Sequence, residues 1–482
     1  MGQFFQQEDF NTEQYQEFVS RLYQQLDDLK SLLDDSKLEQ GDTSIGAELE
    51  LYLVDRAFNP RMINQQILEI ANNPQLTEEL NRYNMEFNLS PVMAQGKPFT
   101  TMDKELRGTL DSVQSIADGL NSQVMAIGIL PTLQHKDLER HCMTDLPRYR
   151  VLTKAISDLR GEAFHINING DESLQTYCDE VTLEGANTSF QLHLRVPQSR
   201  FKNMYNAAQL VTPLLVAISA NSPLFMDKKL WHETRIALFK QSIDSRVDHH
   251  NSHWKNPPRV HFGNGWVREG VWELFAENVA LYPPIIPLLS EDNAFAELSM
   301  HHGTVWNWNR AVFDSGKDQH LRIEFRALPA GPTVTDMMAN AALAIGLTQA
   351  LADDVDGFIS KLPFTYAEYN FYRAAQYGLN ARILWPQPKQ QALQEVSIVD
   401  VIQALLPLAA QGLAQLHVEP GEIDHLMSVI EERLAHKQTG AIWQLNKVAE
   451  HEKTHSRRDS LNLMLSQYLQ NMIEGEPVSK WK

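Results

Sequence analysis

The sequence has 482 residues, of which 43% are hydrophobic and 21% are charged, as in soluble globular proteins with a large core. Its 61 acidic and 42 basic residues give a formal net charge of −19, which argues against binding to nucleic acid or to an anionic membrane, because both depend on basic surface. Two cysteines, Cys142 and Cys178, are too few for a disulfide framework or a cysteine-rich zinc site. With no signal-peptide pattern, these features predict a cytoplasmic protein.

The predicted elements begin with an amphipathic helix, because apolar residues recur at helical spacing between residues 11 and 36. Alternating apolar runs then predict strands at 44–54, 83–89, 123–130, 163–169, 188–196 and 320–329. Helices are expected at 100–120, 203–222, 228–241 and 334–354, with only helices from about residue 365 and a linker at 384–392. This pattern divides the chain into an N-terminal helical extension (1–41), a central domain (42–381) and a helical C-terminal segment (382–482).

Two glutamates stand out in the first predicted strand, which reads IGAELELYLV. Successive side chains of a strand point to opposite faces, so Glu48 and Glu50 share one face while Leu49 and Leu51 share the other. A single strand of this kind is usually half-exposed, with its acids in water. The pair therefore becomes informative only if other strands repeat the arrangement.

Three further predicted strands repeat it, each with one apolar face and one polar face. Their polar faces carry Glu86 and Asn88; Gln191, His193 and Arg195; and Arg322, Glu324 and Arg326. Carboxylates crowded on one face repel one another and raise each other's pKa unless a cation lies among them. The composition of these faces therefore favours a bound cation over four unrelated, half-exposed strands.

The chemistry of these side chains indicates which cation would bind and which type of reaction the site would support. Carboxylates with a single imidazole suit Mg²⁺, or Mn²⁺, better than zinc. The arginines beside Glu324 add a capacity to bind oxyanions, and the combination is typical of phosphoryl transfer. The chain has neither a P-loop nor a G-x-G-x-x-G motif, so any nucleotide would be held mainly through metals and arginines.

A series of motifs then appears in order along residues 42–350: GAELELYLVD, MEFNLSP, TSFQLHLRV, ANSPLF with ETRIALFK, HHGTVWNW and LRIEFRALPAGPT. Together they resemble the glutamate–cysteine ligase family that includes plant enzymes and bacterial carboxylate–amine ligases. A later TGAIWQ (439–444) resembles a weak terminal motif of the same family. The resemblance implies an α+β, glutamine-synthetase-like fold: a curved, mostly antiparallel sheet with a polar concave face and helices behind it. It makes 42–381 the catalytic domain.

The resemblance also implies the roles of individual residues. It makes Glu48, His193 and Glu324 one group of metal ligands and Glu50 with Glu86 a second group. Asn88 and Gln191 would contact metal, water or substrate. Arg326 and Arg235 would bind phosphate or carboxylate with Arg322 behind them, and His301, His302 and Thr304 would lie near the substrates. The sites predicted for the nucleotide are thus Asn88, Gln191, Thr304 and Arg326.

Structural alternatives stay open for several of these residues. Arg235 could form an ion pair on a helix surface, and the residues at 301–304 could form a turn that precedes Trp306. His165, Asn167 and Asn169 of FHINING (164–170) are better explained by an edge strand, and the histidines of 248–253 by a solvated loop.

The leading prediction for function is an ATP- and Mg²⁺-dependent carboxylate–amine ligase that acts through an acyl phosphate, with glutamate as the acid and cysteine as the amine. The same chemistry on another amino acid or amine is the near alternative. A non-catalytic nucleotide or metal sensor on the same scaffold is the distant one. Small-molecule substrates are the expected partners, and the helical ends of the chain could form a homo-oligomer contact.

Overall fold

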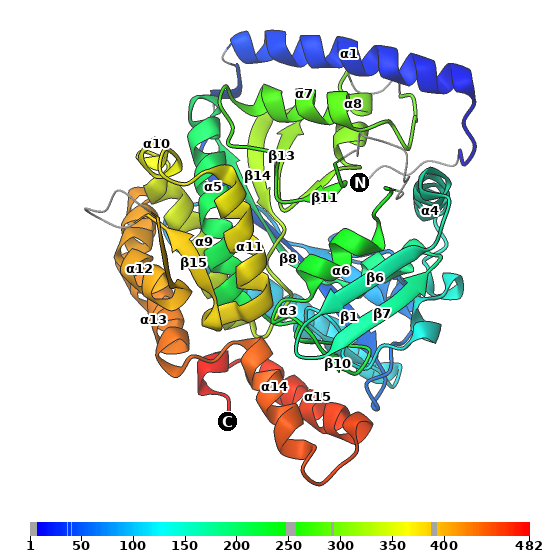
Figure 1. The fold of residues 1–482 in the computed structure, drawn as a ribbon, viewed down its shortest axis with the longest axis vertical. Helices are drawn as coiled ribbons and strands as arrows, with labels where there is room; N and C mark the ends of the chain where they lie inside the picture. Colours follow the sequence, from blue (N-terminus) through cyan, green and yellow to red (C-terminus); the bar gives the residue numbers. More distant parts are fainter. Residues whose placement is uncertain (1–6, 36, 40, 247–256, 291–293, 387–392) are drawn as a thin grey trace.

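An antiparallel sheet of eight strands lies at the centre of the protein in the computed structural model (Figure 1). The structure describes residues 7–35, 37–39, 41–246, 257–290, 294–386 and 393–482. The predicted loop at 248–253 and most of the predicted linker at 384–392 therefore lie outside the described residues. Six strands follow one another across the sheet in the order β13-β14-β8-β1-β3-β2, while β4 and β5 also pair with β1.

The sheet strands are β1 (Ser44–Val54), β2 (Leu76–Glu78), β3 (Asn84–Asn88), β4 (Val92–Met93), β5 (Gln123–Met125), β8 (Phe190–Val196), β13 (Asn309–Asp314) and β14 (His320–Phe325). Four two-stranded ladders join β6 (Phe164–Asn169) to β7 (Ser173–Cys178), β9 (Leu224–Phe225) to β10 (Lys228–Lys229), β11 (Val260–His261) to β12 (Trp306–Asn307), and β15 (Arg382–Trp385) to β16 (Gln394–Ser397). Of these ladders only the β11–β12 pair is parallel among the described residues.

The α-helices are α1 (Thr12–Asp34), α2 (Asn64–Ala71), α3 (Pro98–Gly119), α4 (Pro147–Arg160), α5 (Gln198–Ser219), α6 (Arg235–Ser242), α7 (Val271–Leu281), α8 (Ala296–His302), α9 (Val334–Leu351), α10 (Val355–Ile359), α11 (Phe364–Tyr377), α12 (Ile398–Gln415), α13 (Pro420–His436), α14 (Gly440–His451) and α15 (Arg457–Glu474). One 3₁₀ segment, η4 (Val181–Ala186), also matters for the site.

The alternation of apolar and polar residues along the strands determines which face of the sheet packs against the helices. The alternating apolar residues of β1, β8 and β14, such as Leu49, Leu192 and Ile323, are fully buried in the main core. Helices α5 and α9 pack against this face, and α12 and α13 pack on α9 in turn. Burying such residues stabilises the fold by about 1.5–3 kcal/mol per large side chain, so the opposite, polar face is the one left for chemistry.

The N-terminal helix α1 runs along one end of the molecule, over α7 and α8 (Figure 1). Its apolar stripe of Phe18, Leu22, Leu26 and Leu29 is buried. At the other end in the same view lie α14 and α15. Among the described helices, α12 alone is long and apolar enough to cross a bilayer, and here it packs against α9 and α13.

Most predicted elements correspond to observed ones, with several differences. The expectation of helices alone beyond residue 365 is wrong, because β15 and β16 form a small hairpin there. The predicted helix at 228–241 begins only at Arg235, since its first residues form β10 and a turn. The strand predicted at 123–130 ends at Met125, and the elements that were not predicted include β2, β4, β7, β13, α2, α4, α7 and α8. Strand β2 is only three residues long, which is too short for a period-two pattern to show.

Candidate active site: two carboxylate clusters on one face of the sheet

A first cluster joins the neighbouring strands β1, β8 and β14. In the antiparallel register Glu324 lies directly opposite His193, and Glu48 reaches the same point from β1. One potential ligand atom from each of the three side chains lies within 4.8 Å of the others, and His193 Nε2 is 3.0 Å from the Glu48 carboxylate. The structure thus brings together the residues that the sequence assigned to one group.

Two arginines compensate the negative charge of this first cluster. Arg310, opposite Glu324 in the register of β13 and β14, approaches its carboxylate with Nε at 2.7 Å and Nη2 at 2.6 Å. Arg326 contacts the other carboxylate oxygen. Burial alone would raise the pKa of Glu324, but the two guanidinium groups lower it well below its ordinary value. The pKa of Glu48 is also lowered, because burial raises it less than His193 and Arg326 lower it.

A second cluster lies beside the first, where β1, β3 and the end of β2 meet. Ligand atoms of Glu50, Glu79 and Glu86 lie within 4.8 Å of one another. The donors to Glu50 are neutral: Ser189 donates from its backbone nitrogen at 2.8 Å and its hydroxyl at 2.9 Å, and Gln191 Nε2 donates at 3.0 Å. Glu86 accepts from Asn88 Nδ2 at 2.9 Å. The two clusters therefore differ in how their charge is compensated.

Because no cationic side chain contacts the second cluster directly within the described part of the chain, the pKa values of its carboxylates are raised. Burial, together with Glu79, raises the pKa of Glu50 to about 7. Burial and the other glutamates also raise the pKa of Glu79 and, strongly, that of Glu86. A fourth carboxylate, Glu184 in η4, has its pKa raised to about 8 by burial and by the charges of Glu79 and Glu50. Four carboxylates that suppress each other's ionisation form the kind of environment that a divalent cation relieves.

The side chains present fit Mg²⁺ or Mn²⁺. The donor set is made of carboxylate oxygens with one imidazole, which hard divalent cations prefer. Two buried polar atoms at the junction of the clusters, His193 Nδ1 and Gln191 Oε1, also have no hydrogen-bond partner within the described part of the chain. The roles of these residues as ligands stay a prediction, but the geometry that the roles require is present.

Arg326 and Arg235 lie close to the carboxylates. Arg326 is sensitive to both clusters, since burial opposes its charge while Glu324, Glu48 and Glu50 raise its pKa. Arg235 begins α6, is only 3% exposed, and its charge lowers the pKa of Glu50 against the effect of burial. The alternative of a helix-surface ion pair for Arg235 is therefore wrong.

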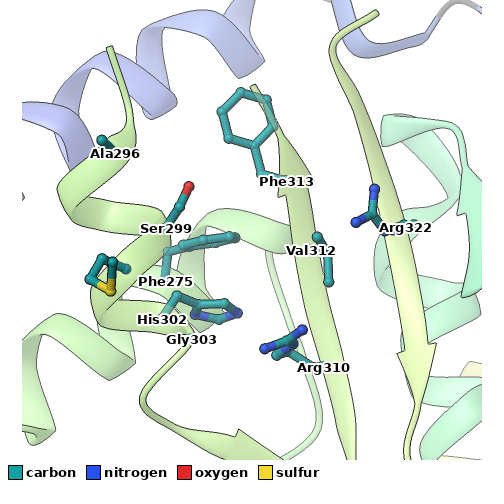
Figure 2. A pocket seen from close by; sticks show the side chains of 10 residues that line it. Phe275, Ala296, Ser299, His302, Gly303, Arg310, Val312, Phe313 and Arg322 are labelled. Carbon is teal, nitrogen blue, oxygen red and sulfur yellow. The ribbon is translucent and has the colours of Figure 1, made fainter. Parts of the chain in front are cut away.

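A cavity of about 220 Å³ opens at the outer end of the polar face, between α7, α8 and the strands β13 and β14 (Figure 2). Phe275, His302, Val312 and both Arg310 and Arg322 line it. Because Arg310 also holds Glu324, the cavity adjoins the first cluster. Arg322 does not contact either cluster; its guanidinium pairs with Asp314 at 3.0 Å, so a direct role in catalysis stays a prediction.

The segment at 301–304 is buried and consists of the last two residues of α8 and the turn that follows them. Thr304 Oγ1 donates to the carbonyl of His301 at 2.7 Å and accepts from Arg259 at 3.2 Å. His302 stacks on Phe275 with ring centroids 4.1 Å apart. These contacts agree with the structural alternative for the turn, although His302 does face the cavity. Binding of nucleotide by Thr304 stays a prediction.

The structural alternative also holds for His165 and its neighbours, which lie in the β6–β7 hairpin. His165 stacks on Tyr177 with centroids 4.6 Å apart. Both cysteines are free thiols, and burial raises the pKa of each.

Sequence reasoning missed three residues of the site. Arg310 had a usable signal, because NRAVFD alternates polar and apolar residues as the other sheet strands do. Glu79 and Glu184 had none: the first follows a three-residue strand and the second lies in a 3₁₀ segment. Their approach to Glu50 depends on how separate segments pack together.

Comparisons with known proteins agree with this architecture. Residues 44–453 match the family model of glutamate–cysteine ligase family 2. A relative from Nocardia farcinica, named "Putative glutamate--cysteine ligase 2-2", is 23% identical over 344 residues, which are 70% of this chain and 73% of the relative. The solved structure of a glutamate–cysteine ligase from Francisella tularensis in complex with AMP superimposes with a TM-score of 0.56 at 11% identity, covering 91% of this chain and 90% of the other.

A bifunctional glutathione synthetase from Pasteurella multocida gives a TM-score of 0.46 at 10% identity, covering 96% of this chain and 55% of that one. The fold and the family match define the class of protein: a glutamine-synthetase-like, ATP-dependent carbon–nitrogen ligase. Within that class the chain belongs to glutamate–cysteine ligase family 2. Both the fold class and the family expected from the sequence are thus confirmed.

Proposed function

We propose that this protein forms γ-glutamylcysteine from glutamate and cysteine with hydrolysis of ATP to ADP and phosphate. The observation that carries the proposal is the pair of carboxylate clusters on one sheet face, with Arg326 within electrostatic reach of both. The match to glutamate–cysteine ligase family 2 supports the choice of glutamate and cysteine. The same chemistry on another amine is the second candidate, because the residues that would select the amine lie outside the two clusters.

The two clusters would hold Mg²⁺ or Mn²⁺: Glu48, His193 and Glu324 in one place, and Glu50, Glu79 and Glu86 in the other. When bound there, divalent cations neutralise charge on the phosphate oxygens of ATP. Asn88 and Gln191 orient the second set, since each donates to one of its carboxylates. The cavity of about 220 Å³ beside Arg310 adjoins the first cluster, and we propose that it takes the nucleoside of ATP.

In the first step a γ-carboxylate oxygen of glutamate attacks the γ-phosphorus of ATP. The bond from that phosphorus to the β–γ bridging oxygen breaks, and ADP leaves. Charge develops on the equatorial oxygens of the transferred group, where fixed guanidinium groups stabilise it without reorganisation. Arg326 is held for this purpose by Glu324, and Arg235 supplies a second buried positive charge beside Glu50.

In the second step the amino nitrogen of cysteine attacks the carbonyl carbon of the acyl phosphate. The bond from that carbon to the phosphate oxygen breaks, and phosphate and one proton are released. Negative charge appears on the carbonyl oxygen during the attack, so the same arginines serve both steps. Buried guanidinium groups suit this role because they stay charged at any physiological pH.

The test follows release of ADP from purified protein with ATP, Mg²⁺ and glutamate while each of the twenty amino acids is added in turn. We expect turnover that depends on cysteine, with γ-glutamylcysteine detected by mass spectrometry. Turnover that depends on another amino acid would identify the second candidate. Tight binding of ATP without turnover under every condition would instead favour a sensor and contradict the proposal.

Removing divalent cations gives an independent test of the two clusters. We expect EDTA to abolish turnover and added Mg²⁺ or Mn²⁺ to restore it, because the carboxylates would otherwise repel the phosphates of ATP. Full activity in the presence of excess EDTA would contradict the assignment of both clusters.

We also propose that the protein is cytoplasmic. Its partners would be its small-molecule substrates rather than nucleic acid or a membrane. The acidic composition, with a net charge of −19, supports this view. We further propose that the protein forms a homo-oligomer, and size-exclusion chromatography with light scattering tests this.

A further inference from the structure

The segment TGAIWQ (439–444) lies far along the chain from both carboxylate clusters, and the chemistry above does not use it. Thr439 caps α14 by accepting a hydrogen bond from the backbone nitrogen of Ile442 at 3.3 Å. The first turn of this helix then meets the loop that follows α5. The backbone nitrogen of Ala441 donates to the carbonyl of Ala220 at 2.8 Å, and Gln444 Nε2 donates to Asn221 Oδ1 at 2.8 Å.

Asn221 is fully buried and holds three parts of the chain together. Besides accepting from Gln444, it donates from Nδ2 to the hydroxyl of Tyr468 in α15 at 2.8 Å and to the carbonyl of Ala330 at 2.8 Å. The Tyr468 hydroxyl in turn donates to the carbonyl of Ala126 at 2.8 Å. Every donor and acceptor of the Asn221 side chain is therefore oriented by helices α14 and α15 or by the loops beneath them.

Hydrogen bonds link this loop to Glu233, beyond the β9–β10 hairpin, and Glu233 in turn contacts Arg235. The carboxylate of Glu233, which is fully buried, accepts from the Asn221 backbone nitrogen at 2.9 Å and from the Ser222 hydroxyl at 2.7 Å. It then contacts Arg235 Nη1 at 3.4 Å. Arg235 Nη1 also donates to the carbonyl of Ala327 at 3.3 Å, while its Nε–H has no partner among the described residues. A buried guanidinium with a free donor is available for a ligand.

Two glycines allow the close approach that this chain of contacts needs. A Cβ on Gly440 would lie 2.0 Å from Asn221 Oδ1, so only glycine lets α14 reach that side chain. A Cβ on Gly128 would lie 3.0 Å from the Ser222 side chain and 3.1 Å from Arg235 Cδ. The Arg235 side chain thus lies between the backbone at Gly128 and the carboxylate of Glu233, which Asn221 and Ser222 hold in place.

We propose that Gln444 and Tyr468, acting through Asn221 and Glu233, are positioning residues that hold Arg235 in the orientation the ligase reaction needs. This inference rests on the proposed function, in which Arg235 stabilises transferred oxyanions. Positioning residues of this kind matter because misplacement of a catalytic group by about 1 Å can slow a reaction by about 100-fold. The terminal motif TGAIWQ thereby acquires a role although it contacts no substrate.

The test is a double-mutant cycle between Tyr468→Phe and Arg235→Lys, measured as kcat for ADP release. Tyr468→Phe removes one hydroxyl and keeps the ring. We expect it to lower kcat about 10-fold in the wild-type background and to change it less than about 2-fold in the Arg235→Lys background, because the group that it positions is then absent. A purely structural loss would lower the rate by the same factor in both backgrounds.

Ser460→Ala is the matched control, since it also removes one buried hydroxyl from α15. The Ser460 hydroxyl has no hydrogen-bond partner within the described part of the chain and is not connected to Asn221. We expect kcat to stay unchanged in this variant. A loss equal to that of Tyr468→Phe would mean that any disturbance of α15 slows the enzyme, which would overturn the proposal.

A crystal structure of the Tyr468→Phe, Gln444→Leu double variant keeps the two proposals separable. We expect the Arg235 guanidinium to have moved away from Glu233. If it stays in place, the positioning proposal is overturned whatever the kinetics show. If wild-type protein has no ligase activity with any amino acid, the proposed function fails, and the position of Arg235 in this crystal structure still decides whether α14 and α15 hold it.

Discussion

Glu324 has four charged or ionisable side chains around it: Glu48 of β1, His193 of β8, Arg310 of β13 and Arg326, which follows β14. It lies opposite His193 in the sheet register, and Arg310 and Arg326 contact its two carboxylate oxygens. The residue is fully buried, and its carboxylate is the one that both guanidinium groups contact directly, which offsets part of their desolvation. At the scale of single residues, Glu324 is thus both a proposed metal ligand and the direct partner of two partly buried arginines.

Glu324→Gln is expected to abolish measurable turnover and to destabilise the fold by about 3–5 kcal/mol, because two guanidinium groups lose a buried partner. ADP release and thermal unfolding measure the two effects. Glu422→Gln is the control: Glu422 is also buried, but its carboxylate accepts from Thr100 on another part of the molecule. Turnover in the Glu324 variant at the wild-type rate would remove this residue from the site.

Glu184 is expected to make the metal-free protein less stable as the pH rises. Burial and the nearby Glu79 and Glu50 raise its pKa from 4.5 to about 8. Between these values the folded protein holds a proton that the unfolded chain has released, so the free energy of unfolding falls as the pH increases. This contribution is fully present below pH 4.5 and is lost as the pH rises through about 8.

Thermal unfolding in EDTA at several pH values measures this effect. The melting temperature of the wild type should fall by a few degrees between about pH 5.5 and about pH 8.5, and Glu184→Gln should flatten that slope. Glu69→Gln, at an exposed position of α2, should leave the slope as it is. A slope that is identical in wild type and in Glu184→Gln would show that Glu184 does not retain its proton.

At the scale of elements, the strands that carry the site were predictable because their pattern has a period of two. β1, β3, β8 and β14 each alternate apolar and polar residues, and the apolar set alone fixes which face turns to the core. The same rule would have found β13 and Arg310. It could not find Glu79 or Glu184, because a three-residue strand and a 3₁₀ segment have no such period, and their place beside Glu50 depends on tertiary packing.

Helix α1 was also predictable, because its buried stripe follows helical spacing. Leu22→Ala is expected to destabilise the protein by about 2–4 kcal/mol through the cavity it leaves against α7 and α8. Val19→Ala, on the exposed side of the same helix, should change stability by less than about 0.5 kcal/mol. Equal melting temperatures for the two variants would contradict the packing described for α1.

At the scale of the whole molecule, the C-terminal helices are joined to the central part by buried charge. Arg433 in α13 contacts Asp336 in α9 at 2.7 Å, and both residues are almost wholly buried. Sequence patterns predicted the helices but not this contact, because the residues are 97 positions apart and each looks like an ordinary polar residue of a helix. The predicted division at residue 382 stays a prediction, and the ion pair crosses it.

Arg433→Met is expected to lower stability by about 3–5 kcal/mol, since it leaves Asp336 buried without its partner. Arg382→Met is the matched control, because Arg382 pairs with Glu395 at 3.6 Å on an exposed surface, where such pairs contribute about 0–1 kcal/mol. Differential scanning calorimetry compares the two. We expect one unfolding transition in both proteins, at a lower temperature in Arg433→Met. If the substitution instead affects only a separate transition of the C-terminal helices, these helices are not closely coupled to the central part.

The hydroxyl of Tyr468 reaches the carbonyl of Ala126 across 342 positions of sequence. During synthesis the ribosome delivers the strands bearing both carboxylate clusters long before α14 and α15 emerge. A nascent or prematurely terminated chain would thus carry the acidic residues without the contacts around Asn221. Such a chain is expected to consume little ATP, because Arg235 would lack the contacts that we propose hold it in place.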